Sequence, residues 1–392
     1  MYAGRSGRVI LGMLGTAAAV WVLSVTLVGQ AAPPAGQAPT APAGARPPLA
    51  EEVFTNVQLL KGMPVDQFMG TMGFFASATG LNCTDCHIEE SGGSWARYAD
   101  DNVLKQTTRR MMLMVNAINK TNFAGRQVVT CFTCHRGMSR PQVMPSINLL
   151  YSSPLDDEPG EPFPPAPGQP PAEQVLDKYL QAVGGAPRLA ALNSIVAKGL
   201  YIGFDDADKA PMEIFATPQG RTTLVRSASG LTTTVITPKG GWIAAPETDR
   251  PVPLLWVTGH ELEGANLEVQ AFFPGRIKQA LTNWRRGFPT IIDDRDVELV
   301  QGDLPGGGVA TLAFDSETGL LTRSVRYGNS PVGRIVTRVD YSDYRDVGGV
   351  KIPFKWTVAW LNGRSHYELT DAQPNVKVDP ARFNRPAPSP RP

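Results

Sequence analysis

All four cysteines of this 392-residue chain lie in two copies of one short pattern, C-x-x-C-H. The copies occupy Cys83–His87 and Cys131–His135, and they also use two of the four histidines. No cysteine is left for another role. The group that binds to these two motifs therefore constrains how the surrounding segment can fold.

The spacing within each copy suits one kind of prosthetic group. Two thiols separated by two residues can add to the two vinyl groups on one edge of a haem, and the next residue, a histidine, then lies beneath the iron. C-x-x-C-H is the signature of c-type haem attachment. We therefore predict two covalent haems c. The residues predicted to hold them are the four thiols and the two imidazoles, Cys83, Cys86, Cys131, Cys134, His87 and His135.

Two other uses of paired cysteines remain open. A zinc site is built from C-x-x-C units, but a zinc site explains neither the adjacent histidine nor the export of the chain. Disulfides are the usual state of cysteine in secreted chains, yet a C-x-x-C pair is more often redox-active or a ligand set. His260 and His366 lie outside any ligand pattern, so we expect them to be surface or core residues.

The N-terminus indicates export. Arg5 and Arg8 precede an uncharged apolar run over residues 9–29, which is typical of a secretory signal with cleavage near Ala31. The run is also long enough to span a bilayer, which takes about 20 apolar residues. It is therefore either removed or kept as an inner-membrane anchor, and both alternatives place the body of the chain in the periplasm.

Composition divides the chain and excludes one class of partner. The balance of 37 Lys+Arg against 36 Asp+Glu argues against nucleic acid, whose binding depends on neutralising phosphates. Prolines gather in two stretches that cannot bury a core. The predicted divisions are a signal peptide or anchor, a spacer, a dihaem domain, a linker and a β-rich domain, over residues 1–32, 33–50, 51–150, 151–171 and 172–392.

The dihaem segment contains an internal repeat, in which each copy is an amphipathic helix with methionine followed by C-x-x-C-H. The first helix should begin at Pro64 and end at Gly80. The second should be capped by Asp100 or Asp101. Its apolar face should hold Val103, Thr107, Met111, Met114 and Ile118.

The C-terminal part changes to a strand pattern. Residues 173–183 predict a helix that stops at Gly184-Gly185, and residues 261–273 and 276–286 predict two more. Alternation over 321–327 predicts a strand, and residues 351–369 predict a hairpin that turns at Asn362-Gly363. The predicted fold class is α + β multidomain, with a helical dihaem domain followed by a curved antiparallel sheet that resembles a half-barrel and carries helices on its concave face.

The residues around both motifs carry a family resemblance. The stretch 72–87 has the sequence M-G-F-F-A-S-A-T-G-L-N-C-T-D-C-H, and the stretch 109–137 contains R-R-M-M-L-M-V-N-A-I-N and V-T-C-F-T-C-H-R-G. These resemble the cytochrome c subunit of photosynthetic reaction centres. That family is tetrahaem, built from two dihaem halves, and residues 51–143 resemble one half.

The resemblance implies a sixth iron ligand, a methionine from the helix before each attachment site. By position these are Met72 for the first haem and Met111 for the second. Met69, Met112 and Met114 are expected to be packing residues. Iron held by His and Met has no open position, so we expect an electron carrier rather than an enzyme. The expected redox partners are small c-type cytochromes or a membrane-bound electron-transfer complex.

Acidic residues gather in the sequence around the first motif and basic residues around the second. A solvated mixed surface is the simpler interpretation, while the sharper one orients a redox partner and pairs arginines with haem propionates. The acids are Asp85, Glu89, Glu90, Asp100 and Asp101, and the bases are Lys105, Arg109, Arg110, Arg126, Arg136 and Arg140.

The C-terminal part more weakly resembles the half-barrel of lipoprotein carrier and sorting proteins, through its strand pattern and the segment from Val339 to Trp356. This keeps a second hypothesis open. In it, the chain is an envelope protein that binds a lipid or hydrophobic ligand on the concave face, and the dihaem domain senses redox state.

Overall fold

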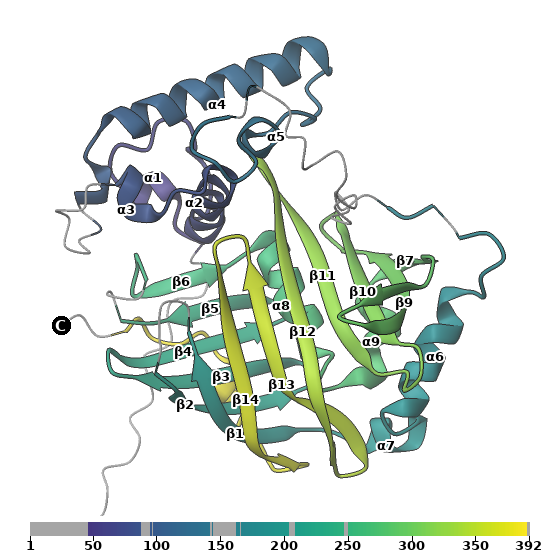
Figure 1. Cartoon of the computed structure of the whole chain (residues 1–392). Coiled ribbons are helices and arrows are strands. Elements are labelled where there is room, and N and C mark those ends of the chain that lie inside the picture. Colours follow the sequence, from purple (N-terminus) through teal and green to yellow (C-terminus); the bar gives the residue numbers. More distant parts are fainter. Residues whose placement is uncertain are drawn as a thin grey trace, which may run out of the picture. The chain divides into compact units, whose positions relative to one another are not determined.

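The computed structural model describes residues 46–87, 95, 97–141, 143, 162–164, 166–203, 208–246 and 250–389. These belong to one compact unit. It contains a group of helices followed by a large antiparallel sheet (Figure 1). The apolar run 9–29 and most of the linker 151–171 lie outside this part of the chain. Within it, no helix has the length and apolar character needed to cross a membrane.

The helical part is organised around α2 and α4. Its elements are α1 Ala50–Val53, α2 Val65–Thr79, α3 Cys83–Cys86, the 3₁₀ helix η2 Arg97–Ala99, α4 Val103–Asn122 and α5 Cys131–His135. The predicted ends of the first helix are confirmed, because Pro64 is its N-cap and Gly80 its C-cap with φ +67°. A Cβ on Gly80 would lie 2.3 Å from the carbonyl oxygen of Gly137, so only glycine allows this approach to the residues after the second motif.

The start of α4 differs from the prediction. Its N-cap is Asn102, whose side-chain oxygen accepts a hydrogen bond from the backbone N–H of Lys105 at 2.9 Å. Asp101 instead pairs with Arg109. The other end of α4 is tied to the loop before α5 by buried Asn119, which accepts from two backbone N–H groups and donates to a carbonyl oxygen of that loop.

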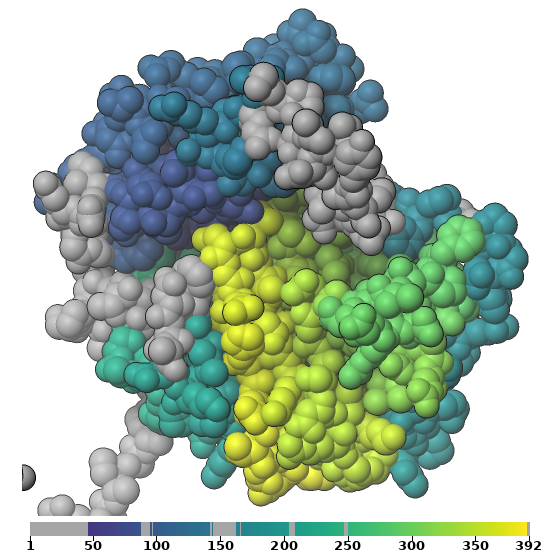
Figure 2. All heavy atoms as spheres, viewed as in Figure 1, coloured from purple at the N-terminus to yellow at the C-terminus, as the bar shows by residue number. Residues whose placement is uncertain are grey.

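The described C-terminal residues form an open antiparallel sheet of 14 strands. The strand order is β6-β5-β4-β3-β2-β1-β14-β13-β12-β11-β10-β9-β7, with β8 paired to β9. The strands are β1 Ile195–Ile202, β2 Ala210–Thr217, β3 Gly220–Ser227, β4 Gly230–Thr237, β5 Gly240–Ala244, β6 Leu254–Val257, β7 Thr282–Arg286, β8 Thr290–Ile292, β9 Arg295–Asp303, β10 Val309–Asp315, β11 Leu321–Ser330, β12 Gly333–Val347, β13 Val350–Trp360 and β14 Gly363–Pro374. The sheet is strongly curved in Figure 1, and its yellow and yellow-green strands form a continuous surface in Figure 2. The predicted fold class is confirmed.

Helices pack against the inner face of this curve. They are α6 Ala172–Ala182, α7 Ala186–Ala191, α8 Gly259–Val269 and α9 Ile277–Ala280, with the 3₁₀ helix η4 Pro274–Arg276. The 3₁₀ helix η5 Pro380–Phe383 lies on the other face, where Arg382 stacks over Phe215. The predicted helices over 173–183 and near 261–273 are therefore confirmed. Tyr179 from α6 packs against Phe314 from the sheet, and Phe272 packs edge-on against Trp356. These contacts belong to one large apolar core between the helices and the sheet.

Two local predictions in this part are wrong. The helix expected over 276–286 ends at Ala280, and β7 follows, because Arg285 and Arg286 form ion pairs with Asp303 and Glu298 of β9. The predicted hairpin exists, but Trp360 pairs with Gly363, so its turn lies one residue earlier than Asn362-Gly363.

The helical part touches the sheet through α2. The Asp66 carboxylate accepts hydrogen bonds from Thr258 N–H at 2.7 Å and from its hydroxyl. Thr258 is the N-cap of α8, so a side chain from α2 supplies the acceptor that the first turn of α8 needs. Phe74 of the same helix packs in a small apolar cluster with Val332 from the turn between β11 and β12.

Candidate functional site

A cavity of about 260 Å³ lies beside the first C-x-x-C-H motif. We call it the first-site cavity. One side is formed by Cys83, Cys86 and His87, and most of the remaining wall is apolar. The other lining residues come from α2, the segment before it, η2 and α4, and include Leu60, Phe68, Met69, Met72, Phe75, Tyr98, Lys105, Arg109 and Met112.

Each C-x-x-C segment forms a single helical turn with a reciprocal cap. In the first motif the Asn82 side chain accepts from Asp85 N–H at 2.9 Å, while the Asp85 carboxylate accepts from Asn82 N–H at 2.8 Å. Thr130 and Thr133 form the corresponding cap in the second. All four cysteines are free thiols. Because residues three apart lie on one side of a helical turn, both thiols of each motif can reach the same edge of a ligand.

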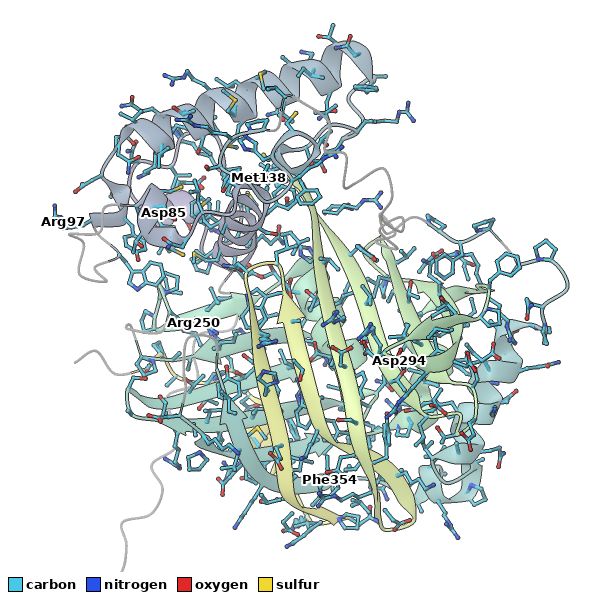
Figure 3. The ribbon with its side chains drawn as sticks, viewed as in Figure 1. Asp85, Arg97, Met138, Arg250, Asp294 and Phe354 are labelled. Atoms are coloured by element: carbon cyan, nitrogen blue, oxygen red, sulfur yellow. The ribbon has the colours of Figure 1, made fainter. Side chains whose placement is uncertain are left out.

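The two motif histidines share one hydrogen-bonding arrangement. His87 Nδ1 lies 2.8 Å from the backbone oxygen of Tyr98, and His135 Nδ1 lies 2.9 Å from that of Met138. A carbonyl oxygen only accepts, so Nδ1 carries the proton in both rings and Nε2 carries the lone pair. This is the usual arrangement of a metal-binding histidine. Figure 3 labels Met138 and Asp85 in this helical part.

The start of α4 supports the first motif from behind. Lys105 Nζ donates to the Tyr98 carbonyl oxygen at 2.8 Å, so that oxygen serves both His87 and Lys105. The Asn102 side chain donates to the carbonyl oxygen of Cys86 at 2.7 Å. Burial lowers the pKa of His87; the bond to Tyr98 opposes this shift and the charge of Lys105 adds to it. No sequence pattern marks this network, because its central acceptor is a backbone atom.

Some methionines of the helical part line the first-site cavity, and others are exposed. Met72, the predicted first ligand, lines the first-site cavity, and so do Met69 and Met112, which were expected to be packing residues. Met112 is buried, whereas Met111 is 37% exposed and Met114 45% exposed. Met111 and Met112 are consecutive residues and therefore point about 100° apart around α4, and Met111 is not among the residues that line the first-site cavity.

Two of the basic residues lie near a different motif from the one with which the sequence groups them. Lys105 and Arg109 were grouped with the second motif, but both line the first-site cavity. Arg109 pairs with Asp101 at 2.8 Å and holds the pKa of that carboxyl below its usual value. Glu89 and Glu90, expected in the acidic group, lie outside the described residues.

Large apolar side chains are exposed along α4 and beside the second motif. An exposed apolar surface of this kind commonly marks a binding site. The exposed apolar residues of α4, α5 and the segments beside them are Val103, Leu104, Met111, Leu113, Met114, Val128, Phe132 and Met138.

Part of the chain is similar to a known family. Residues 9–148, which we call the cytochrome-like segment, match the family model described as photosynthetic reaction centre cytochrome C subunit. The resemblance to that family is confirmed. The chain is 40% identical over 102 residues to the photosynthetic reaction center cytochrome c subunit of Thermochromatium tepidum, covering 24% of this chain and 23% of the relative. It is 34% identical over 113 residues to that of Roseobacter denitrificans, covering 27% and 29%. The chain thus spans about a quarter of the length of these curated relatives.

The donor set of the cytochrome-like segment fits a haem c. Around the first-site cavity stand two thiols, an imidazole with Nε2 free to bind iron, three thioethers, an apolar wall and two basic side chains. Among the described residues, no group of three or more His, Cys, Asp and Glu side chains is placed to hold a metal ion directly. The apolar wall of the first-site cavity fits an iron carried inside an apolar macrocycle.

Solved structures similar to this chain match its sheet. A DUF1329 family protein from Desulfovibrio piger covers 55% of this chain and 98% of its own, at 10% identity and a TM-score of 0.39. A putative outer membrane lipoprotein-sorting protein domain from Vibrio parahaemolyticus covers 54% and 97%, at 10% identity and a TM-score of 0.37. These likenesses concern the course of the chain alone.

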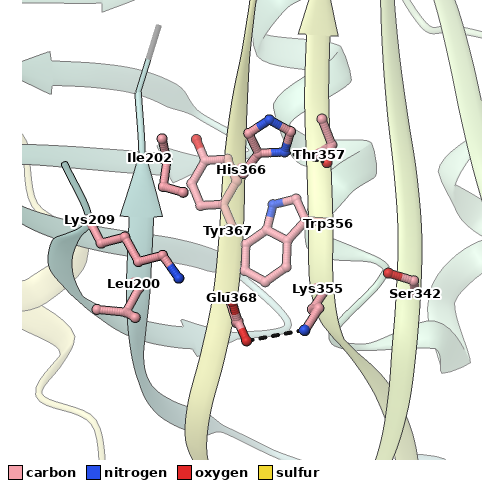
Figure 4. A pocket seen from close by; sticks show the side chains of 10 residues that line it. All are labelled: Leu200, Ile202, Lys209, Ser342, Lys355, Trp356, Thr357, His366, Tyr367 and Glu368. Atoms are coloured by element: carbon pink, nitrogen blue, oxygen red, sulfur yellow. Dashed lines mark hydrogen bonds and ion pairs between the residues drawn. The ribbon is translucent and has the colours of Figure 1, made fainter. Parts of the chain in front are cut away.

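A second cavity, of about 240 Å³, lies on the sheet between β1, β12, β13 and β14 (Figure 4). Lys355 Nζ and Glu368 Oε1 form an ion pair of 3.2 Å beside it, and His366 is hydrogen-bonded to Thr357 at 2.9 Å. These polar groups already satisfy one another. The expectation that His366 has a surface or core role agrees with this placement.

Proposed function

We propose that the cytochrome-like segment binds two covalent haems c and carries electrons in the periplasm. The observation that carries the proposal is the shared geometry of the two motifs. Both histidines donate Nδ1–H to a backbone carbonyl, at 2.8 and 2.9 Å, and thiols on a capped helical turn stand directly before each ring. In this proposal Cys83 and Cys86 hold one haem and Cys131 and Cys134 the other, with His87 and His135 as axial ligands.

Two full sets of axial ligands favour electron transfer over catalysis. Each haem supplies a reversible one-electron change, and a His/Met pair closes both axial positions. The chain's own part is to hold the ligands, exclude water with the apolar wall and set the local charge. The proposed redox partners are small c-type cytochromes or a membrane-bound electron-transfer complex, since the curated relatives are reaction centre subunits by name.

Counting haems tests this proposal directly. The full chain should be expressed in a host competent for cytochrome c maturation and analysed by pyridine haemochrome assay against protein concentration. We expect two haems per chain, with haem-linked peptides containing Cys83–Cys86 and Cys131–Cys134. Zinc without haem in protein matured in such a host would contradict the proposal.

The proposed sixth ligands are Met72 and Met111. Met72→Ala and Met111→Ala should each remove one iron–sulfur charge-transfer band at the red edge of the oxidised spectrum and lower one reduction potential, because a thioether ligand raises the potential. Met114→Ala is the matched control, since it lies on the same helix and should lose only packing. Met114→Ala removing the band while Met111→Ala keeps it would show that the ligand assignment is wrong.

The packing of the sheet does not favour the alternative of lipid binding. The inner face is covered by α6 and α8, and its core includes large aromatic side chains such as Phe272 and Tyr179. Buried charge also lies there, since Arg326 of β11 bonds to Glu261 of α8 at 2.8 Å. An apolar ligand would have to displace helices and break this ion pair.

A further inference from the structure

The backbone oxygen of Tyr98 receives two donors, His87 Nδ1 and Lys105 Nζ, each at 2.8 Å. Lys105 is held in place by a third contact, because its ammonium also donates to the carbonyl oxygen of Asp100 at 2.8 Å. The backbone N–H of Lys105 donates a hydrogen bond to the side chain of Asn102, the N-cap of α4. The cation is therefore fixed behind the proximal histidine of the first motif.

This sharing changes what the histidine can give to a metal. A hydrogen bond from Nδ1 to a carbonyl makes the ring a stronger ligand. A carbonyl that also accepts from an ammonium has less electron density for the imidazole, so the ring becomes a weaker donor. A weaker axial donor favours ferrous over ferric iron. The positive charge acts in the same direction, because it disfavours the additional charge of the ferric state.

We propose that Lys105 is a positioning residue that raises the reduction potential of the haem held by Cys83 and Cys86, acting through the Tyr98 carbonyl and His87. The inference deepens the proposed function and rests on it. The effect should fall on one haem, because Lys105 bonds to the Tyr98 and Asp100 carbonyls, whereas the acceptor for His135 is the Met138 carbonyl.

The test is a redox titration of the full chain with both haems bound. Lys105→Met keeps the length of the side chain and removes the charge and the donor. It should make reduction of one haem three- to tenfold less favourable, where tenfold is about 59 mV for one electron, and leave the second haem unchanged. Lys105→Arg should restore most of the wild-type value. Lys120→Met, an exposed lysine at the other end of α4, is the matched control and should move neither potential.

The possible results distinguish a failure of the inference from a failure of the proposed function. Unchanged potentials in Lys105→Met, or equal shifts of both haems, would overturn the inference, because a specific effect through Tyr98 must be confined to one haem. If Lys105→Met binds fewer haems, Lys105→Gln is titrated and must show the same one-sided loss. A wild-type chain without haem would instead refute the proposed function.

Discussion

Replacing Cys83 and Cys86 with alanine should leave one covalent haem per chain. Both thiols of the first motif lie on one helical turn, α3, beside the first-site cavity, and their removal leaves the second motif on α5 intact. The pyridine haemochrome assay should fall from two haems per chain to one, and a haem-stained denaturing gel should keep a band at half intensity.

The mirror variant, Cys131→Ala with Cys134→Ala, supplies the control. It should also keep one haem, but with a different potential, because Lys105 and Arg109 line the first-site cavity, where we propose that the haem of Cys83 and Cys86 binds. Identical spectra and potentials in the two single-haem variants would show that the two haems do not have different environments.

The second large effect is expected inside the sheet. Arg326→Ala should lower the free energy of unfolding by about 2 kcal/mol, because it leaves the Glu261 carboxylate, whose side chain is only 32% exposed, without its arginine partner. The Arg326 side chain is 8% exposed and bonds Glu261 at 2.8 Å. α8 approaches it so closely that a Cβ on Gly264 would lie 1.8 Å from its Nε. Urea unfolding followed by tryptophan fluorescence measures the change.

The same pair predicts a pH dependence. Burial raises the pKa of Glu261, but Arg326 and His260 lower it more strongly, so it lies well below its usual value. A carboxyl with a lowered folded pKa stabilises the protein above its unfolded pKa, and this contribution is lost as the pH falls. The difference between wild type and Arg326→Ala should therefore narrow as the pH falls below the ordinary glutamate value of 4.5.

Lys355→Ala is the control for charge alone. Its ion pair with Glu368 is on the surface, with side chains 47% and 42% exposed, and such pairs contribute at most about 1 kcal/mol. A loss of stability in Arg326→Ala no larger than in Lys355→Ala would show that the buried pair does not hold α8 on the sheet.

The sequence predicted those features whose causes are local. Pro64 and Gly80 bound α2 because their backbone preferences are intrinsic. The strand β11 was predicted from alternation, but its buried positions include Ser324 and Arg326, because the facing helix α8 supplies a carboxylate. Burial there depends on a partner far away in the sequence.

The wrong predictions also depend on partners that are far away in the sequence. Residues 282–286 form a strand because acids on β9 pair with Arg285 and Arg286, and no local pattern shows those partners. The motif cysteines and histidines were visible from spacing alone. Lys105 was not, because its link to His87 passes through a backbone carbonyl, which has no sequence signature.

We propose that this chain carries electrons on two haems, each held by a histidine and a methionine. A spectroelectrochemical titration of the full chain with and without carbon monoxide tests it most directly, because carbon monoxide binds ferrous iron only where an axial position is open. We predict two one-electron steps whose midpoint potentials are the same under both conditions. A rise of either midpoint under carbon monoxide, with a shifted Soret band, would contradict the claim and point to a haem that binds a ligand.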